Sequence, residues 1–182
     1  MTFVEPMERR PEDSSSTATD ARAYGVGDRV EDFVLADLAG REVRLSQVAG
    51  TWTVLYFTAT WCPYCTAEAP FIEDAVASKF QDRGVRLVVI DVKEPPEIGR
   101  QLPDRFGWSA PFLIDATGEV STRFAPRKEG LPPEVSIINA HVVLDVDGVI
   151  RYAEYLNMER FDAHVTSLVE ALERLTGGES NG

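Results

Sequence analysis

Cysteine is scarce in this sequence, and its two cysteines, Cys62 and Cys65, are separated by only two residues. A secreted disulfide scaffold needs several bridges, and a bridge across so short a loop restrains the unfolded chain little. A structural zinc site needs four ligands, whereas the only histidines, His141 and His164, lie far from each other and from the cysteines in sequence. The pair is therefore a poor candidate for a purely structural role.

Positive charge is also in short supply. The chain has 18 Lys and Arg against 30 Asp and Glu, which gives a net charge of −12. Nucleic acids and anionic membrane surfaces attract basic patches, so the balance argues against both as partners. No apolar run approaches the roughly 18 residues needed to span a bilayer. A length of 182 residues with 44% hydrophobic residues predicts one domain with a sizeable core.

The chain divides into an arm, a body and a tail. Residues 1–24 combine prolines, a Ser/Thr run and scattered charges with almost no apolar periodicity, which is typical of a disordered arm. Residues 25–176 are expected to form the domain, and residues 177–182 a flexible tail. The arm lacks the apolar segment of a signal peptide. We therefore expect a cytoplasmic protein, or an extracytoplasmic one if an N-terminal segment had been removed.

Strand and helix patterns alternate in the body and predict the α/β class. Residues 52–58 and 85–92 are short β-branched and aromatic runs, as buried strands are. Between them, apolar residues recur at helical spacing from Ile72 to Phe80, and Gly84 follows as a stop signal. A strand, a helix and a strand of these lengths form a βαβ unit, so part of the sheet should be parallel.

The remaining elements are predicted from turn and cap signals. One hairpin is expected around Gly40 and another around residues 146–148. A short strand is expected at residues 112–115. The chain should close with a helix over residues 158–175, with Asn157 as its N-cap.

The cysteine pair falls where the 52–58 strand passes into the following helix. Pro63 takes a first-turn position, where its missing N–H costs nothing. Cys62 should then face the helix N-terminus, whose unpaired N–H groups favour a thiolate. Cys65 lies one turn further in, within reach to close a disulfide. Thiol–disulfide exchange needs this asymmetry between an exposed, activated nucleophile and a shielded resolving thiol.

The cysteine segment is similar to that of a known family. Residues 61–70, WCPYCTAEAP, resemble the W-C-x-x-C-x-x-E-x-P signature of TlpA/ResA-like thiol–disulfide oxidoreductases, within the thioredoxin-fold and AhpC/TSA redoxin group. Residues 27–33, 112–118 and 142–148 resemble further segments of such domains, so the likeness covers about residues 25–175.

The resemblance implies a thioredoxin-like fold, in which helices flank a central mixed sheet extended by an N-terminal hairpin. It also implies a dithiol that reduces or exchanges disulfides in partner proteins and is restored by a thiol reductant. A redox-active Cys62–Cys65 disulfide would serve in place of a bound cofactor, and no metal is implied.

Individual site residues follow from the same resemblance. Glu68 lies three residues after Cys65 on the same helix face and is a candidate proton-transfer partner, with a solvated surface charge as the alternative. The candidates for binding substrate are Trp61, Pro63, Tyr64 and Asn139. Two nearby residues receive plainer interpretations: Tyr56 as a core residue and His141 as a half-buried residue at the start of a strand.

One position departs from the family pattern. A cis-proline usually stands six residues before the hairpin aspartate, and counting back from Asp145 gives Asn139. A cis bond before a residue other than proline costs about 3–4 kcal/mol, so the Ile138–Asn139 bond should be trans. Pro111 is a second candidate for the cis-proline.

Three other functions compete with the oxidoreductase. A thiol peroxidase is favoured by Asn139, since peroxiredoxin-type members also lack proline there, but Ala59 stands where their T-x-x-C motif has threonine. A copper-delivery module of the Sco type needs a C-x-x-x-C motif and a histidine about eight residues before the hairpin aspartate, whereas His141 stands four before it. A glutaredoxin shares C-P-Y-C, but its T-V-P loop and Gly-Gly pair are not matched.

Overall fold

The computed structural model describes residues 22–177; residues 1–21 of the predicted arm and 178–182 of the predicted tail lie outside this range. The last residues of the predicted arm belong to the folded body. The backbone N–H of Tyr24 donates to the carbonyl of Arg123 at 2.8 Å, and the ring of Tyr24 packs on Phe124 with 5.1 Å between centroids. The folded body therefore begins slightly before residue 25, the start that the sequence composition predicts.

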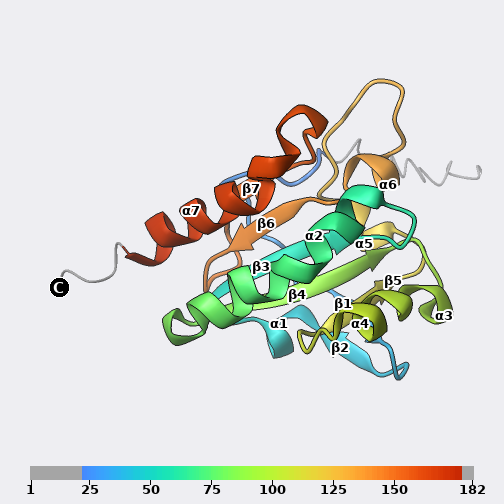
Figure 1. Ribbon diagram of the computed structural model, residues 1–182, viewed down its shortest axis with the longest axis horizontal. Coiled ribbons are helices and arrows are strands. Elements are labelled where there is room, and N and C mark those ends of the chain that lie inside the picture. Colours follow the sequence, from blue (N-terminus) through green and yellow to red (C-terminus); the bar gives the residue numbers. More distant parts are fainter. Residues whose placement is uncertain (1–21, 178–182) are drawn as a thin grey trace, which may run out of the picture.

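A seven-stranded mixed sheet forms the centre of the described residues, in the order β2-β1-β5-β4-β3-β6-β7 (Figure 1). The strands are β1 Val34–Asp37, β2 Glu42–Arg44, β3 Trp52–Thr58, β4 Val85–Val92, β5 Phe112–Asp115, β6 His141–Leu144 and β7 Ile150–Glu154. Strand β4 runs parallel to β3 and to β5, and the other pairs are antiparallel. This sheet and its flanking helices confirm the expected α/β class, with the β1–β2 hairpin at one edge.

Helices cover both faces of the sheet (Figure 1). They are α1 Leu45–Val48, α2 Pro63–Glu73, α3 Pro96–Gly99, α4 Gln101–Phe106, α5 Glu119–Thr122, α6 Pro133–Ser136 and α7 His164–Gly177. A π-helical turn at Asp74–Ser78 continues α2, and a 3-10 turn at Met158–Ala163 precedes α7. The sequence analysis did not predict the short helices α3 to α6.

Strand β3 divides the interior into two cores. Its residues are all buried, and alternate side chains of a strand point to opposite faces. Val54 and Tyr56 pack among side chains of α2, α4 and α7. Leu55 and Phe57 pack on the other face, in a cluster that includes Leu45 of α1 and Val120 of α5. A strand buried on both faces reads as a continuous apolar run, which is the pattern predicted at residues 52–58.

The closing helix begins later than predicted. The side chain of Asn157 accepts a hydrogen bond from the N–H of Glu159 at 3.0 Å, which confirms the predicted N-cap. Arg160 then leaves the helical region, with φ −128° and ψ 27°, so the first turn is 3-10 and α7 starts at His164. This break places His164, only 2% exposed, at the start of α7. Within residues 22–177, no helix combines the length and apolar character needed to cross a bilayer.

The docking of α7 should depend on Leu168, which is fully buried against the sheet. Leu168→Ala removes methyl groups from a packed interior, and we expect a loss of about 2–5 kcal/mol in the free energy of unfolding, measured with urea. Leu175→Ala, at a partly buried position of the same helix, is the matched control and should cost clearly less. Equal losses in the two variants would contradict this account of α7.

Candidate active site: a dithiol beside a buried glutamate–histidine cluster

The two cysteines lie at the start of α2, as the sequence pattern predicts. Cys62 is the N-cap, and its Sγ accepts a hydrogen bond from the backbone N–H of Cys65 at 3.1 Å. Pro63 occupies the first turn. Both cysteines are free thiols. The helix N-terminus therefore places its N–H donors around Cys62, where they stabilise negative charge on sulfur.

The environments of the two thiols push their pKa values in opposite directions. A hydrogen bond from the Cys65 thiol, supported by the N–H groups of Cys65 and Tyr64, lowers the pKa of Cys62 although burial opposes it. Burial raises the pKa of Cys65 well above its ordinary value, and the hydrogen bond with Cys62 and the negative charge of Cys62 add to the rise. Cys62 is the better nucleophile and Cys65 the thiol that keeps its proton.

The expected exposure of Cys62 is wrong. Its side chain is only 2% exposed, and Cys65 is fully buried. The sulfur of Cys62 turns toward the N–H of Cys65, so the helix start that activates it also draws it inward. Activation and access are therefore separate properties of this thiol.

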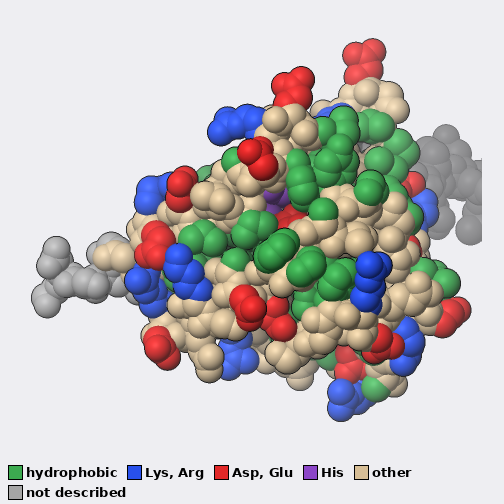
Figure 2. Space-filling model, viewed as in Figure 1, with side chains coloured by type: hydrophobic (Ala, Val, Ile, Leu, Met, Phe, Trp, Pro, Cys, Tyr) green, Lys and Arg blue, Asp and Glu red, His purple; other side chains and the backbone are tan. Residues whose placement is uncertain are grey.

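Glu68 is a buried charge rather than a solvated one. It is 2% exposed, and its carboxylate faces three polar side chains. Oε1 forms an ion pair with Nε2 of His141. Oε2 accepts a hydrogen bond from Nδ2 of Asn139 at 2.5 Å and lies 3.5 Å from Nδ1 of His164. Figure 2 shows histidine atoms at the bottom of a narrow gap between hydrophobic side chains.

This cluster keeps Glu68 ionised. Burial alone would raise the pKa of Glu68, but the positive charge available on His141 and the hydrogen bonds from both histidines outweigh it and lower the pKa from 4.5 to about 2. Glu68 is thus a fixed anion near neutral pH, one turn after Cys65 on α2. Its negative charge also acts on the dithiol, because it raises the pKa of Cys62.

The two histidines are the functional candidates that sequence reasoning missed. His141 is fully buried, not half-buried as expected, because β6 pairs with β3 and places His141 opposite Tyr56. His164 arrives from α7, and the two rings stack with 4.1 Å between centroids and 22° between planes. All four residues of β6 are buried, so the strand has no alternating pattern that would mark His141, and nothing local indicated His164 as its neighbour.

Tyr56 is a core residue, as expected, but its hydroxyl group belongs to the same neighbourhood. Nδ2 of Asn139 lies 3.4 Å from the Tyr56 oxygen. Burial raises the pKa of Tyr56 well above its ordinary value, and negative charge on Cys65 and on Glu68 raises it further. The Tyr56 hydroxyl is therefore within electrostatic reach of both the resolving thiol and the buried carboxylate.

The expected substrate-binding residues separate into two groups. Trp61 is 56% exposed and Pro63 is exposed, while Tyr64 is half-buried and packs on Phe161 with 4.9 Å between ring centroids. Asn139 is fully buried, so its assignment to substrate binding is wrong for the side chain. The reason is its left-handed backbone, φ 65°, which accompanies the inward contacts with Glu68 and His164. No peptide bond among residues 22–177 is cis, so the bond before Asn139 is trans as expected, and Pro111 is not a cis-proline either.

A second buried acid supports the loop that precedes Cys62. The N–H and hydroxyl of Thr60 donate to Glu94 at 3.0 and 2.6 Å. Burial and the nearby carboxyl groups of Glu94 and Asp115 raise the pKa of Asp91 to about 9. Asp91 therefore carries a proton at neutral pH, which lets these acids lie together beneath the loop.

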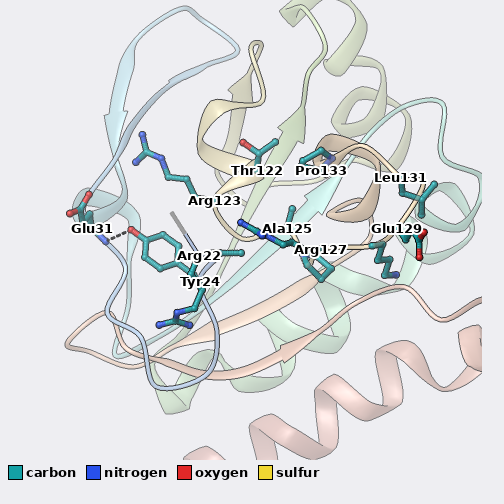
Figure 3. A pocket seen from close by; sticks show the side chains of 13 residues that line it. Arg22, Tyr24, Glu31, Thr122, Arg123, Ala125, Arg127, Glu129, Leu131 and Pro133 are labelled. Carbon is teal, nitrogen blue, oxygen red and sulfur yellow. Dashed lines mark hydrogen bonds between the residues drawn. The ribbon is translucent and has the colours of Figure 1, made fainter. Parts of the chain in front are cut away.

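A pocket of about 860 Å³ lies away from these groups (Figure 3). Its walls carry basic side chains together with Glu31 and Glu129, and neither cysteine lines it. The lining residues are Arg22, Ala23, Tyr24, Glu31, Thr122, Arg123, Ala125, Pro126, Arg127, Lys128, Glu129, Leu131 and Pro133. The dithiol and the Glu68 cluster therefore lie outside this cavity.

Comparison with known proteins gives a consistent result. A model of the AhpC/TSA family matches residues 26–153. The thiol-disulfide oxidoreductase ResA of Geobacillus thermodenitrificans is 36% identical over 102 residues, which are 56% of this chain and 58% of that protein. The chain thus spans less than two thirds of this relative. ResA of Oceanobacillus iheyensis is 30% identical over 79% of this chain and 77% of its own.

Solved structures agree on the fold. The peroxidoxin BcpB from Mycobacterium tuberculosis is 27% identical, with a TM-score of 0.65 over 82% of this chain and 97% of that one. The fold is thioredoxin-like, as the sequence resemblance implied.

The difference between the two thiols generates a labelling prediction. When the reduced protein is titrated with iodoacetamide, Cys62 should react first, with an apparent pKa below the ordinary value of about 8.5. Peptide mapping identifies the labelled residue, and Cys62→Ser and Cys65→Ser are the paired controls. Faster labelling of Cys65 would reverse the assignment.

The buried Glu68 generates a prediction about acid stability. Its pKa is about 2 in the folded protein against 4.5 ordinarily, so on acidification the unfolded chain takes up the proton first. The contribution, about 3 kcal/mol at 1.36 kcal/mol per pKa unit, is present above pH ~4.5 and is lost as the pH falls toward ~2. Urea unfolding of wild type and Glu68→Gln should show a stability gap that closes over this window. A gap independent of pH would contradict it.

Proposed function

Because the chain belongs to the AhpC/TSA family, we propose that it is a thiol–disulfide oxidoreductase that acts on disulfides of partner proteins. The observation that carries the proposal is the opposed tuning of two adjacent thiols, with Cys62 activated at the helix start and Cys65 holding its proton one turn below. The ResA relatives carry the name of this activity.

The exchange proceeds in two steps. The Cys62 thiolate attacks one sulfur of the partner disulfide, a mixed disulfide forms, and the other partner sulfur leaves with the electron pair of the broken bond. Cys65 then loses its proton and attacks the sulfur of Cys62. The bond to the partner breaks, the second partner thiol leaves, and two electrons have passed from the dithiol to the partner. A thiol reductant restores the dithiol, so the Cys62–Cys65 disulfide serves as the redox group without a bound cofactor.

Exposed aromatic surface beside the dithiol is suited to receive a polypeptide partner. Trp61 immediately precedes Cys62 and is 56% exposed. Tyr64 and Phe161 form an edge-on aromatic pair that joins α2 to the turn before α7. Aromatic side chains combine large apolar area with few rotatable bonds, which suits them to contact surfaces.

A thiol peroxidase is the second candidate, favoured by the similarity to a peroxidoxin. Rapid peroxide reduction needs groups that polarise the O–O bond beside the thiolate. Position 59 is a buried alanine, Asn139 is turned toward Glu68, and the hydroxyl of Thr60 is bound to Glu94. These positions offer Cys62 no obvious donor for the departing oxygen, so we favour the disulfide substrate.

Two assays on one reduced sample separate these functions. Insulin disulfide reduction, supported by dithiothreitol, should show a larger second-order rate constant than consumption of hydrogen peroxide. Cys62→Ser should abolish insulin reduction beyond the dithiothreitol background, whereas Cys65→Ser should accumulate a mixed disulfide with the substrate. Fast peroxide consumption with negligible disulfide exchange would replace the oxidoreductase with the peroxidase.

A further inference from the structure

The cluster around Glu68 is a buried polar site assembled from distant segments. Glu68 comes from α2, His141 from β6, His164 from the start of α7 and Asn139 from the turn before β6, and each is at most 2% exposed. Buried polar groups persist only where they are satisfied or functional. The proposed exchange chemistry assigns no role to the two histidines.

The hydrogen bonds determine where protons sit. Nδ2 of Asn139 donates to Glu68, which leaves its Oδ1 to accept from Nδ1 of His164 at 2.9 Å. His141 directs Nε2 at the other Glu68 oxygen. Nδ1 of His164 is thus a donor to the cluster, and Nε2 of His141 is the nitrogen that faces the carboxylate. Nε2 of His141 contacts Glu68 as an ion pair and not with hydrogen-bond geometry, and the opposite nitrogens, Nδ1 of His141 and Nε2 of His164, are buried without a hydrogen-bond partner among the described residues.

Those two nitrogens are the positions that an added proton would occupy. With both imidazoles neutral, the cluster has the net negative charge of Glu68. One added proton makes it neutral overall, which burial favours. A second would place two cations on rings stacked 4.1 Å apart, where like charges repel strongly. The geometry therefore favours one proton shared by the pair.

The same side chains resemble a donor set for a transition metal, since their ligand atoms lie within 4.8 Å of one another. A metal lies close to the ring plane of each imidazole that binds it. The ring planes of His141 and His164 are only 22° apart and face each other, so their nitrogens point side by side instead of converging. The two imidazoles are therefore better placed to donate to the Glu68 carboxylate than to bind one metal ion together.

The cluster is electrostatically connected to the dithiol. The charge of Glu68 raises the pKa of Cys62. Negative charge on Cys65 and on Glu68 also raises the pKa of the Tyr56 hydroxyl. Formation of the Cys62 thiolate adds a second negative charge near Glu68, which both histidines contact. A positive charge on the histidine pair is therefore attracted by the thiolate as well as by Glu68.

We propose that His141 and His164 share one proton that is bound when the Cys62–Cys65 pair is reduced and released when it forms a disulfide. The proposal rests on the exchange reaction proposed above. Oxidation of the reduced state by a partner disulfide yields two partner thiols, which need two protons. Cys65 supplies one as its sulfur bonds to Cys62, and the histidine pair supplies the other. Two electrons and two protons leave together, so charge balances.

The groups that face the pair from neighbouring elements belong to the same titration. Glu154 on β7 is paired in register with His141, and its carboxylate accepts a hydrogen bond from the Tyr152 hydroxyl at 2.5 Å. The remaining titratable groups are Glu68, Cys62 and Cys65 from α2 and Tyr56 from β3. Of these groups, only the cysteines change charge or bonding when the dithiol is oxidised. A difference in histidine titration between the reduced and the oxidised protein therefore reports on the cysteines.

The test is nuclear magnetic resonance of the imidazole nitrogens in the full chain, whose only histidines are these two. Each redox state is prepared chemically, with dithiothreitol or diamide, and titrated with pH. We expect one shared protonation step for the pair, with at least tenfold tighter proton binding in the reduced state. Identical titrations in both states, or two independent steps, would overturn the proposal.

A variant links this proton to turnover. His164→Gln keeps a side-chain amide toward Asn139 but does not titrate, and single-turnover insulin reduction should lose the pH step that matches the shared proton. His164→Asn should behave alike, whereas an unchanged pH profile in both would contradict the proposal. If the wild-type protein failed to reduce insulin, the proposed function would be overturned. The shared proton would still be tested separately, because the nuclear magnetic resonance titration needs no substrate. Stoichiometric zinc binding by the oxidised protein, lost in His164→Gln, would reassign the cluster to a metal.

Discussion

The burial of one carboxylate charge constrains the whole site. A buried anion is costly unless it is paired and hydrogen-bonded, and Glu68 finds its partners in Asn139, His141 and His164. These residues come from the turn before β6, from β6 itself and from α7. The closing third of the chain must therefore converge on the helix that carries the cysteines. The contacts that stabilise the Glu68 carboxylate therefore also fix the position of the helix that carries the dithiol.

Asn139 shows how the chain solves it without the proline that the resemblance leads one to expect. Its N–H donates to the carbonyl of Phe57 at 2.8 Å, which anchors the turn to the end of β3. Its backbone is left-handed, φ 65°, a conformation that asparagine tolerates better than most residues. The side chain is then free to bond Glu68 and His164. A polar network thus shapes the loop beside the dithiol.

Local signals predicted the elements that carry the cysteines, but not the cluster beneath them. The β-branched runs at 52–58 and 85–92 are strands with those bounds, because a strand buried on both faces is legible from its own residues. The meeting of His141 and His164 depends on β3–β6 pairing and on the break at Arg160. Neither the strand pairing nor the break produces a periodic pattern of residues that could be recognised in the sequence. Helices α3 to α6 have only four to six residues, too few to show a helical period.

Two buried acids near the active-site segment take opposite protonation states because their neighbours differ. Asp91 faces other carboxyl groups and keeps its proton, so it adds no negative charge to the acids beneath the loop that precedes Cys62. Glu68 faces imidazoles, stays ionised and opposes the Cys62 thiolate. The reactivity of Cys62 is then a balance between the N–H donors of the helix start and this one anion. A proton on the histidine pair offsets the charge of Glu68, so the same cluster that must be satisfied for folding also sets how readily the thiolate forms.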